Sequence, residues 1–179
     1  DGAEGLVPNA VRPQGFQDWN SDPLAGDFDL DWGDPCEPLR PVTLVGARNG
    51  CFSGKVVVGS TEPIRGLRGT PSDLRAGAST IPASNVRIRY GIPWGSEYTV
   101  APYTVPTPYP AEEGFLGALA ESAPEEIPVY EKPVSRASLK TPGQPAPVFG
   151  AVSSVWVTVK VPKDAPAGNY KGEVTVQAG

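Results

Sequence analysis

The end of the chain carries its clearest alternation of apolar and polar residues. From Val155 to Val161 every second residue is valine, and tryptophan, threonine and lysine lie between the valines. A period of two places the valines on one face of a strand. After a turn region rich in aspartate, proline and glycine, a second alternation runs from Tyr170 to Gln177. We expect two half-buried strands, joined either as a β-hairpin or as a corner between two sheets.

Shorter patterns upstream predict more strands and very little helix. Strand-like runs occupy Pro41–Ala47, Gly54–Ser60 and Thr80–Tyr90. One helix is expected at Ala111–Ala120, where a proline precedes two glutamates and an apolar stripe, although two glycines weaken it. Several strands with long proline-rich connections predict an all-β domain, an antiparallel β-sandwich of immunoglobulin-like or jelly-roll character over residues 36–179.

Residues 1–35 lack this periodicity and are expected to form an extended N-terminal arm. The arm carries four large aromatic rings, which are those of Phe16, Trp19, Phe28 and Trp32. Disordered tails are usually poor in aromatic residues, and four exposed rings would be costly. We therefore expect an interaction arm that docks on its own sandwich, on an adjoining domain or on a neighbouring subunit.

Composition and charge limit the kinds of binding partner that the chain is expected to have. A hydrophobic content of 39% supports a folded chain despite 21 glycines and 22 prolines. No run approaches the roughly 18 apolar residues of a membrane-spanning helix, so no membrane span is expected. The net charge of −5 is unevenly spread, because residues 1–34 carry −7 and the remainder carries +2. An acidic chain without basic clusters is a poor candidate for binding nucleic acid.

The absence of histidine from the chain excludes several kinds of catalytic site. Ser-His-Asp and Cys-His systems and histidine-ligated zinc all need that residue. A hydrolase would have to use carboxylates alone. The adjacent pairs Glu112–Glu113 and Glu125–Glu126 would point to opposite faces of a strand, so neither forms an opposed acid and base. We assign no catalytic residue and expect that the chain is not an enzyme.

The two cysteines are candidates for one disulfide. Cys36 and Cys51 lie at the end of the arm and before the first strong strand, and they form no Cys-x-x-Cys motif. A bond between them would contribute about 3 kcal/mol by loop entropy. The alternative is two buried free thiols in a reducing compartment. The secreted character of the composition favours the bond and a secreted or cell-surface location.

An acidic run in the arm is a candidate calcium site, and its members are Asp27, Asp29, Asp31 and Asp34. Calcium takes oxygen ligands and tolerates irregular loops. The run is not an EF-hand, because Trp32 stands where that loop needs glycine and Pro38 stands where it needs glutamate. The alternative is a solvated acidic strand without a metal. No other cofactor is expected.

A second aromatic group is a candidate for contact with sugars, and it consists of Trp94, Tyr98, Tyr103 and Tyr109. Flat rings on a sheet face or loop rim can stack on sugar rings, so a glycan is a candidate partner. The alternative is that these rings cap the core or pack on another domain. Trp156, opposite the valine face of its strand, marks either a contact surface or an exposed ring.

Three stretches resemble a known bacterial domain. The stretches are L-V-G-A-R-N-G-C-F-S-G-K-V-V-V (Leu44–Val58), T-I-P-A-S-N-V-R-I (Thr80–Ile88) and W-V-T-V-K-V-P-K-D-A-P-A-G-N-Y-K-G-E-V-T-V (Trp156–Val176). They are similar to the β-sandwich domain that precedes the catalytic barrel in glycoside hydrolase family 123-like secreted proteins. The resemblance implies a β-sandwich beside a barrel. The family's catalytic carboxylates belong to that barrel, so none is carried over.

Two functions follow as hypotheses. The first is a non-catalytic extracellular module, the accessory domain of a glycan-degrading enzyme, whose partner is the adjoining catalytic domain. The second is a structural subunit of an extracellular filament or surface layer. Its neighbouring subunits would assemble through the N-terminal arm and strand addition. The absence of methionine, even at position 1, predicts a processed form or a piece of a longer protein.

Overall fold

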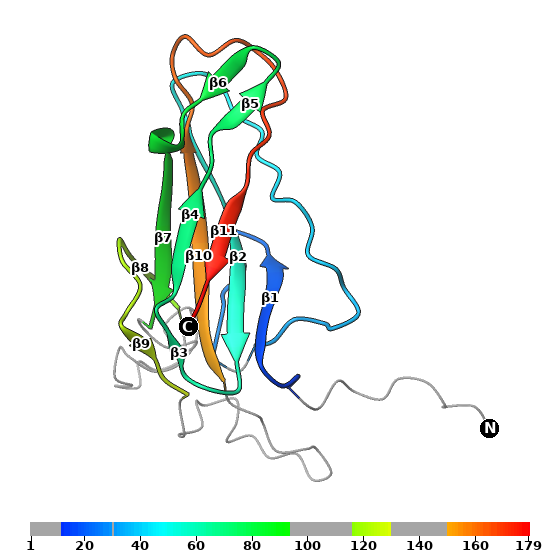
Figure 1. The fold of residues 1–179 in the computed structure, drawn as a ribbon, viewed down its shortest axis with the longest axis vertical. Helices are drawn as coiled ribbons and strands as arrows, with labels where there is room; N and C mark the ends of the chain where they lie inside the picture. Colours follow the sequence, from blue (N-terminus) through cyan, green and yellow to red (C-terminus); the bar gives the residue numbers. More distant parts are fainter. Residues whose placement is uncertain (1–11, 30, 94–115, 130–149) are drawn as a thin grey trace, which may run out of the picture.

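The computed structural model describes residues 12–29, 31–93, 116–129 and 150–179 (Figure 1). In these ranges the regular structure is β throughout, apart from one 3-10 turn at Ala83–Asn85. The predicted all-β class is confirmed. None of the helical structure in these ranges is long and apolar enough to cross a membrane.

Five antiparallel strands form the main sheet, in the order β1-β2-β10-β7-β8. Their bounds are β1 (Phe16–Ser21), β2 (Cys51–Ser60), β10 (Ala151–Lys160), β7 (Val86–Ile92) and β8 (Ala118–Ala120). The strands β2 and β10 pair over their whole length of ten residues, from Ala151 opposite Ser60 to Lys160 opposite Cys51. This long pair is the middle of the molecule, and β1 lies beside it at one edge (Figure 1).

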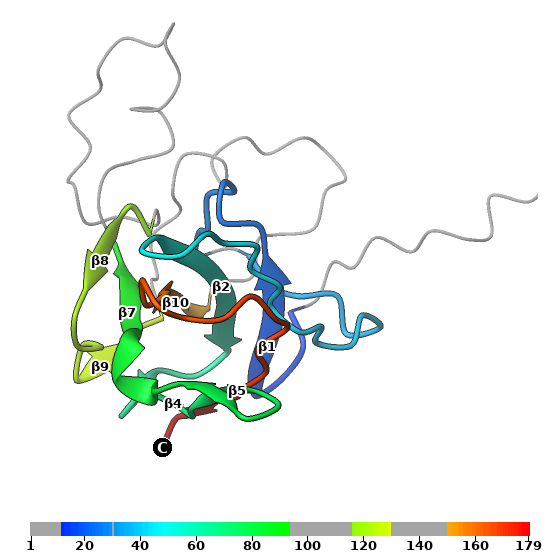
Figure 2. The same ribbon diagram turned by 90° about the horizontal axis from the view of Figure 1, so that it is seen from above.

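Three short two-stranded ladders accompany the main sheet. They pair β11 (Val174–Gln177) with β4 (Arg68–Pro71), β3 (Ile64–Arg65) with β9 (Glu126–Ile127), and β5 (Leu74–Ala76) with β6 (Ser79–Ile81). Seen from above, β4 lies across from β2 and β10, with the core between them (Figure 2). Two antiparallel layers facing each other are consistent with a β-sandwich.

The core lies where the two layers meet. Val58, Tyr90 and Val155 of the main sheet form one buried cluster with Ile64 and Ile127 of the facing layer. The Tyr90 hydroxyl oxygen accepts a hydrogen bond of 2.7 Å from the backbone N–H of Gly69 on β4. Both layers are therefore held together by apolar contact and by a cross-layer hydrogen bond.

The terminal pattern proves to be a corner between two sheets. The strand β10 belongs to the main sheet, whereas β11 pairs with β4 in the facing layer. Val155 is fully buried in the core and Val176 packs against the same core from the other side. Each alternating stretch therefore contributes its apolar face to a different layer, because one face of each layer must be covered by the other.

Three predicted elements differ from the structure in the part of the chain that it describes. The expected strand Thr80–Tyr90 is divided by the 3-10 turn at Ala83–Asn85 into β6 and β7. The run Pro41–Ala47 is irregular rather than a strand, although Val42 lies over Gly54 of β2. The predicted helix Ala111–Ala120 is described only from residue 116, and there β8 occupies Ala118–Ala120. Leu119 pairs with Gly91 of β7, so sheet pairing overrides the weak helical preference of this segment.

Replacing Val155 with alanine should lower the free energy of unfolding by about 2 kcal/mol, because the change removes fully buried methyl groups and leaves a cavity. Chemical denaturation monitored by tryptophan fluorescence measures the change. The matched control is Val45→Ala, whose side chain is 90% exposed and should move stability by less than about 0.5 kcal/mol. Equal effects of the two substitutions would contradict the assigned core.

Candidate functional site

The outer face of the main sheet is the face that points away from the core, and the N-terminal arm covers it. After β1 the chain reverses at Asp22–Ala25, where the N–H of Ala25 donates to the carbonyl of Asp22. The returning segment then buries the side chains of Asp27 and Asp29, which are 5% and 2% exposed as residues. Carboxylates are rarely buried without charged partners, so cations should lie beneath this layer. Such buried charges make the layer the candidate site.

The first partner is Lys55 of β2. Its Nζ lies 2.6 Å from Oδ2 of Asp27 and 2.7 Å from the carbonyl oxygen of Ala25. The Lys55 and Asp27 side chains are only 1% and 6% exposed. The Ser21 hydroxyl donates to the other carboxylate oxygen, Oδ1 of Asp27, over 2.7 Å. The carboxylate is thus bonded at both oxygens, and the ammonium donates to two acceptors.

Strand register explains why these groups meet. In the main sheet Ser21 of β1 stands opposite Lys55, and Trp156 of β10 stands opposite Lys55 on the other side. The three residues therefore form one row across the outer face. Lys55 Nζ lies 5.3 Å from the centroid of the Trp156 ring, a distance at which a cation is attracted to an aromatic face.

Arg12 is the second buried cation beneath the arm. The residue is fully buried, and its Nη2 donates to the carbonyl oxygen of Asp29 over 2.8 Å. Its guanidinium lies 5.4 Å from the centroid of the Trp32 ring. Burial lowers the pKa of Arg12, while the nearby carboxylates of Asp29 and Asp31 act in the opposite direction. A guanidinium keeps its charge in proteins, so this cation is stabilised where it lies by the acids of the arm.

Small residues make room for the Arg12 side chain. A Cβ atom added at Gly150 would lie 2.3 Å from Cζ of Arg12, and one added at Gly59 would lie 3.3 Å from Nη1. The same outer face presents Gly91, where an added Cβ would lie 2.1 Å from Oγ of Ser154. At these positions glycine is needed because neighbouring atoms approach the backbone closely, and not because the chain turns there.

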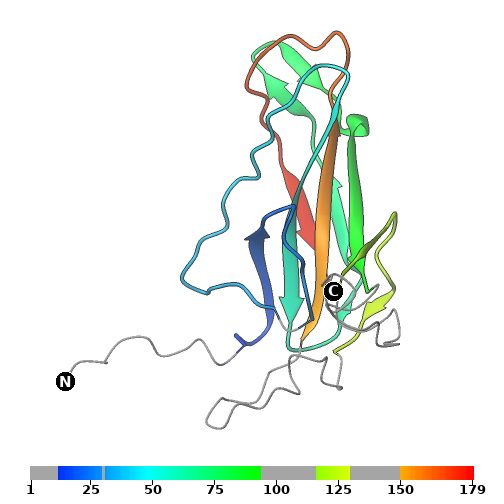
Figure 3. The same cartoon turned by 180° about the vertical axis from the view of Figure 1, so that it is seen from behind.

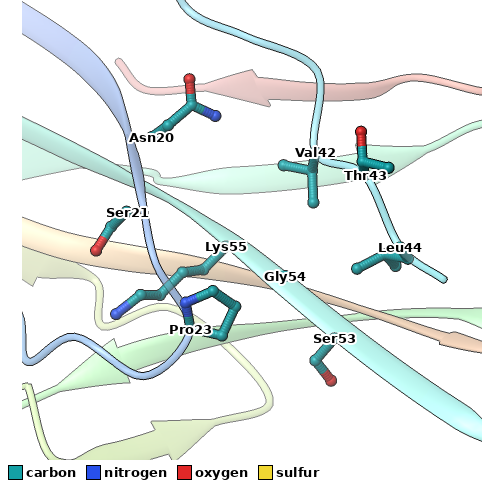
Figure 4. A pocket seen from close by; sticks show the side chains of 9 residues that line it. All are labelled: Asn20, Ser21, Pro23, Val42, Thr43, Leu44, Ser53, Gly54 and Lys55. Carbon is teal, nitrogen blue, oxygen red and sulfur yellow. The ribbon is translucent and has the colours of Figure 1, made fainter.

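A small cleft of about 170 Å³ opens where β1 ends beside β2 (Figure 4). Its lining residues are Asn20, Ser21, Pro23, Val42, Thr43, Leu44, Ser53, Gly54 and Lys55. This lining contains one charged group, the ammonium already paired with Asp27, and no carboxylate. The cleft therefore lacks the pair of carboxyl groups that glycoside hydrolysis uses.

Three of the four arm aromatics, Trp19, Phe28 and Trp32, are half-buried within the chain itself. Trp19 stands opposite Val57 in the β1–β2 ladder, and its ring contacts the positions of Gly33 and Gly59. Phe28 and Trp32 are half-buried in the returning segment, whereas Phe16 is 47% exposed at the start of β1. Figure 3 shows β1 lying alongside β2 from the opposite side of the molecule.

Three members of the acidic run have partners within the protein. Asp27 pairs with Lys55, Asp31 accepts the N–H of Phe28, and Asp34 accepts the N–H of Cys36. Across the described ranges, no three acidic or cysteine side chains gather as a metal site would require. The structure therefore gives the calcium hypothesis for Asp27, Asp29, Asp31 and Asp34 no support.

The remaining predicted residues fall into three groups. Cys36 and Cys51 are both exposed free thiols, so the predicted disulfide is not supported. The aromatic group of Trp94, Tyr98, Tyr103 and Tyr109 lies outside the described residues, as does the pair Glu112–Glu113. Glu126 pairs with Arg65 across β3 and β9, which makes it part of a surface ion pair.

Sequence reasoning missed Lys55 and Arg12. One signal for Lys55 was available: the run Lys55–Val58 continues as three valines instead of alternating, and apolar residues on both faces indicate a strand buried on both sides. A lysine inside such a strand must find an acid, and the arm is rich in them. Arg12 had no comparable signal, because it stands alone in the irregular arm.

Comparisons with known proteins show a distant likeness to solved structures but no related sequence family. No protein-family model and no curated protein sequence matches the chain. Among solved structures, the chain is similar to a family 123 glycoside hydrolase from Clostridium perfringens, described for its hydrolysis of glycolipid glycans. The identity is 16%, the TM-score is 0.39, and the match covers 74% of this chain. It spans 19% of the other chain, about a fifth of that enzyme.

Replacing Asp27 with alanine should lower the free energy of unfolding by about 3–5 kcal/mol, because it leaves the Lys55 amine buried without its acid. Thermal or chemical denaturation measures this loss. The matched control is Glu121→Ala, which removes a carboxylate from the exposed pair with Arg87 and should cost about 1 kcal/mol or less. A loss for Asp27→Ala no larger than the control would show that the buried pair does not hold the arm.

Replacing Gly150 with alanine should displace Arg12 from its place beneath the arm, since the new Cβ would lie 2.3 Å from Cζ. Hydrogen exchange should then rise for residues 27–33 before it rises in β2 or β10. Gly168→Ala is the control, because its added Cβ would make only an ordinary contact of 3.4 Å. Unchanged protection of the arm in Gly150→Ala would refute the role assigned to Arg12.

Proposed function

We propose that this chain is a non-catalytic β-sandwich module that serves as the accessory domain of an extracellular glycan-degrading enzyme. One observation carries the non-catalytic part of the proposal. The buried charged side chains of the described residues, on Arg12, Asp27, Asp29 and Lys55, all lie where the arm meets the sheet. The use of these groups is structural, since Lys55 of the sheet holds Asp27 of the arm, and Arg12 holds the backbone of Asp29.

Sequence resemblance supports the accessory role. The three stretches that resemble the family 123-like sandwich domain include most of β2, the start of β7, the second half of β10 and most of β11. Three of these strands are adjacent in the main sheet, and β11 supplies the facing layer. The likeness therefore concerns the framework of the domain, and it supports an adjoining catalytic barrel as the partner and secretion as the destination.

A second candidate function is a structural subunit of a filament or surface layer. The observation that favours it is the origin of β1, an edge strand of the main sheet that is supplied by the N-terminal arm. Antiparallel pairing of an arm with β2 needs only an extended partner, so the arm of a neighbouring subunit would fit the same ladder. Light scattering after size-exclusion chromatography separates the two functions, because an accessory module stays monomeric and a subunit assembles.

The purified chain should show no turnover on a panel of glycans and glycolipids, since the proposed module leaves bond cleavage to its neighbour. Product release measured by reducing-sugar assay and mass spectrometry tests this. The informative contrary result is hydrolysis that disappears in a Glu125→Gln/Glu126→Gln variant, which would make the chain an enzyme. Activity unaffected by carboxylate substitutions would indicate a contaminating hydrolase.

A further inference from the structure

Lys55 and Asp27 bring an amine and a carboxyl group together in a place that excludes water. Nζ of Lys55 lies 2.6 Å from Oδ2 of Asp27, and the two side chains are 1% and 6% exposed. Amine and carboxyl are the two halves of an amide. We propose that these side chains condense into an intramolecular amide cross-link between Nζ of Lys55 and Cγ of Asp27, which fastens the arm covalently to the main sheet.

Position and burial both favour the reaction. When two reacting groups are held within contact distance, the reaction avoids most of the entropy cost of bringing them together. The row of Ser21, Lys55 and Trp156 is fixed by ladders on both sides of β2, so the amine has little freedom to move away. Burial also keeps water away from the reacting atoms, since the two side chains are 1% and 6% exposed.

The step balances as a condensation. One ammonium proton passes from Nζ to Oδ2, the atom it already bonds, and leaves a neutral amine beside a carboxylic acid. The nitrogen lone pair then attacks Cγ, and negative charge develops on Oδ1, where the Ser21 hydroxyl already donates. A second proton moves from nitrogen to Oδ2, the Cγ–Oδ2 bond breaks, and one water leaves. No oxidant, reductant or cofactor is needed.

The amide product would keep the hydrogen-bond partners of the ion pair. Its single N–H retains an acceptor in the carbonyl oxygen of Ala25, now 2.7 Å from Nζ. Its carbonyl oxygen, the former Oδ1, retains the Ser21 hydroxyl as donor. The N–H and carbonyl of the buried amide would therefore find hydrogen-bond partners already in place, and the two buried charges would be removed.

Intact mass of the folded full-length chain tests the proposal directly. The cross-linked protein should weigh less than its sequence by one water molecule. Tryptic digestion should then release a branched peptide that joins the stretch around Asp27 to the stretch around Lys55. Lys55→Arg and Asp27→Ala should each restore the full sequence mass, and Lys163→Arg, a substitution of an exposed lysine, should leave the loss of water in place.

Ser21→Ala gives a second test that does not depend on loss of the reacting groups. This variant keeps the amine and the acid but removes the donor at Oδ1, so a smaller fraction of the protein should be cross-linked after the same time. The proposal is overturned if native protein, folded and incubated, keeps its full sequence mass. It is equally overturned if the lost water maps to residues other than Asp27 and Lys55.

Discussion

The pairing of Lys55 with Asp27 is the interaction on which the arrangement of the N-terminal arm depends. A lysine in the middle of a ten-residue central strand would be a buried, unpaired charge if the outer face were covered by apolar residues alone. The arm solves this by delivering an acid, a backbone carbonyl and a serine hydroxyl to one point. The outer face is therefore covered by a segment that must dock in one register, since a shift would leave the charge unpaired.

Arg12 is a second buried cation that binds the returning segment of the arm. The returning segment is bound at one end through Asp27 and at the other through the carbonyl of Asp29, so two cations fix its direction. Gly150 and Gly59 lie against the guanidinium, where a larger residue would collide with it. The result is three layers: the facing ladders, the main sheet and the arm. The centre of the main sheet, along β2 and the first half of β10, is buried on both sides, whereas an antiparallel sheet commonly leaves one face to solvent.

This arrangement bears on both proposed functions. An accessory domain needs a rigid body, and a sheet whose central strands are covered on both faces provides one. A subunit that assembles through its arm needs the arm to carry specific contacts, and the row of Ser21, Lys55 and Trp156 provides those. The same contacts hold the arm in place within one chain. A firmly attached arm suits a monomeric accessory domain, and an arm that can leave its own sheet suits a subunit that assembles with its neighbours.

From the amino-acid pattern, the all-β class, the strands β2 and β10 and most of β7 could be predicted, because a period of two is a local property of the chain. The junction between β10 and β11 stayed open as a hairpin or a corner, since the sheet that each strand joins depends on tertiary packing. The sequence pattern could not show that Pro41–Ala47 is irregular or that Ala118–Ala120 is a strand, since a strand exists only where a partner strand lies beside it. Nor could it pair Lys55 with Asp27. That contact depends on the register of β1 against β2 and on the turn at Asp22–Ala25, and both are fixed only when the three layers pack.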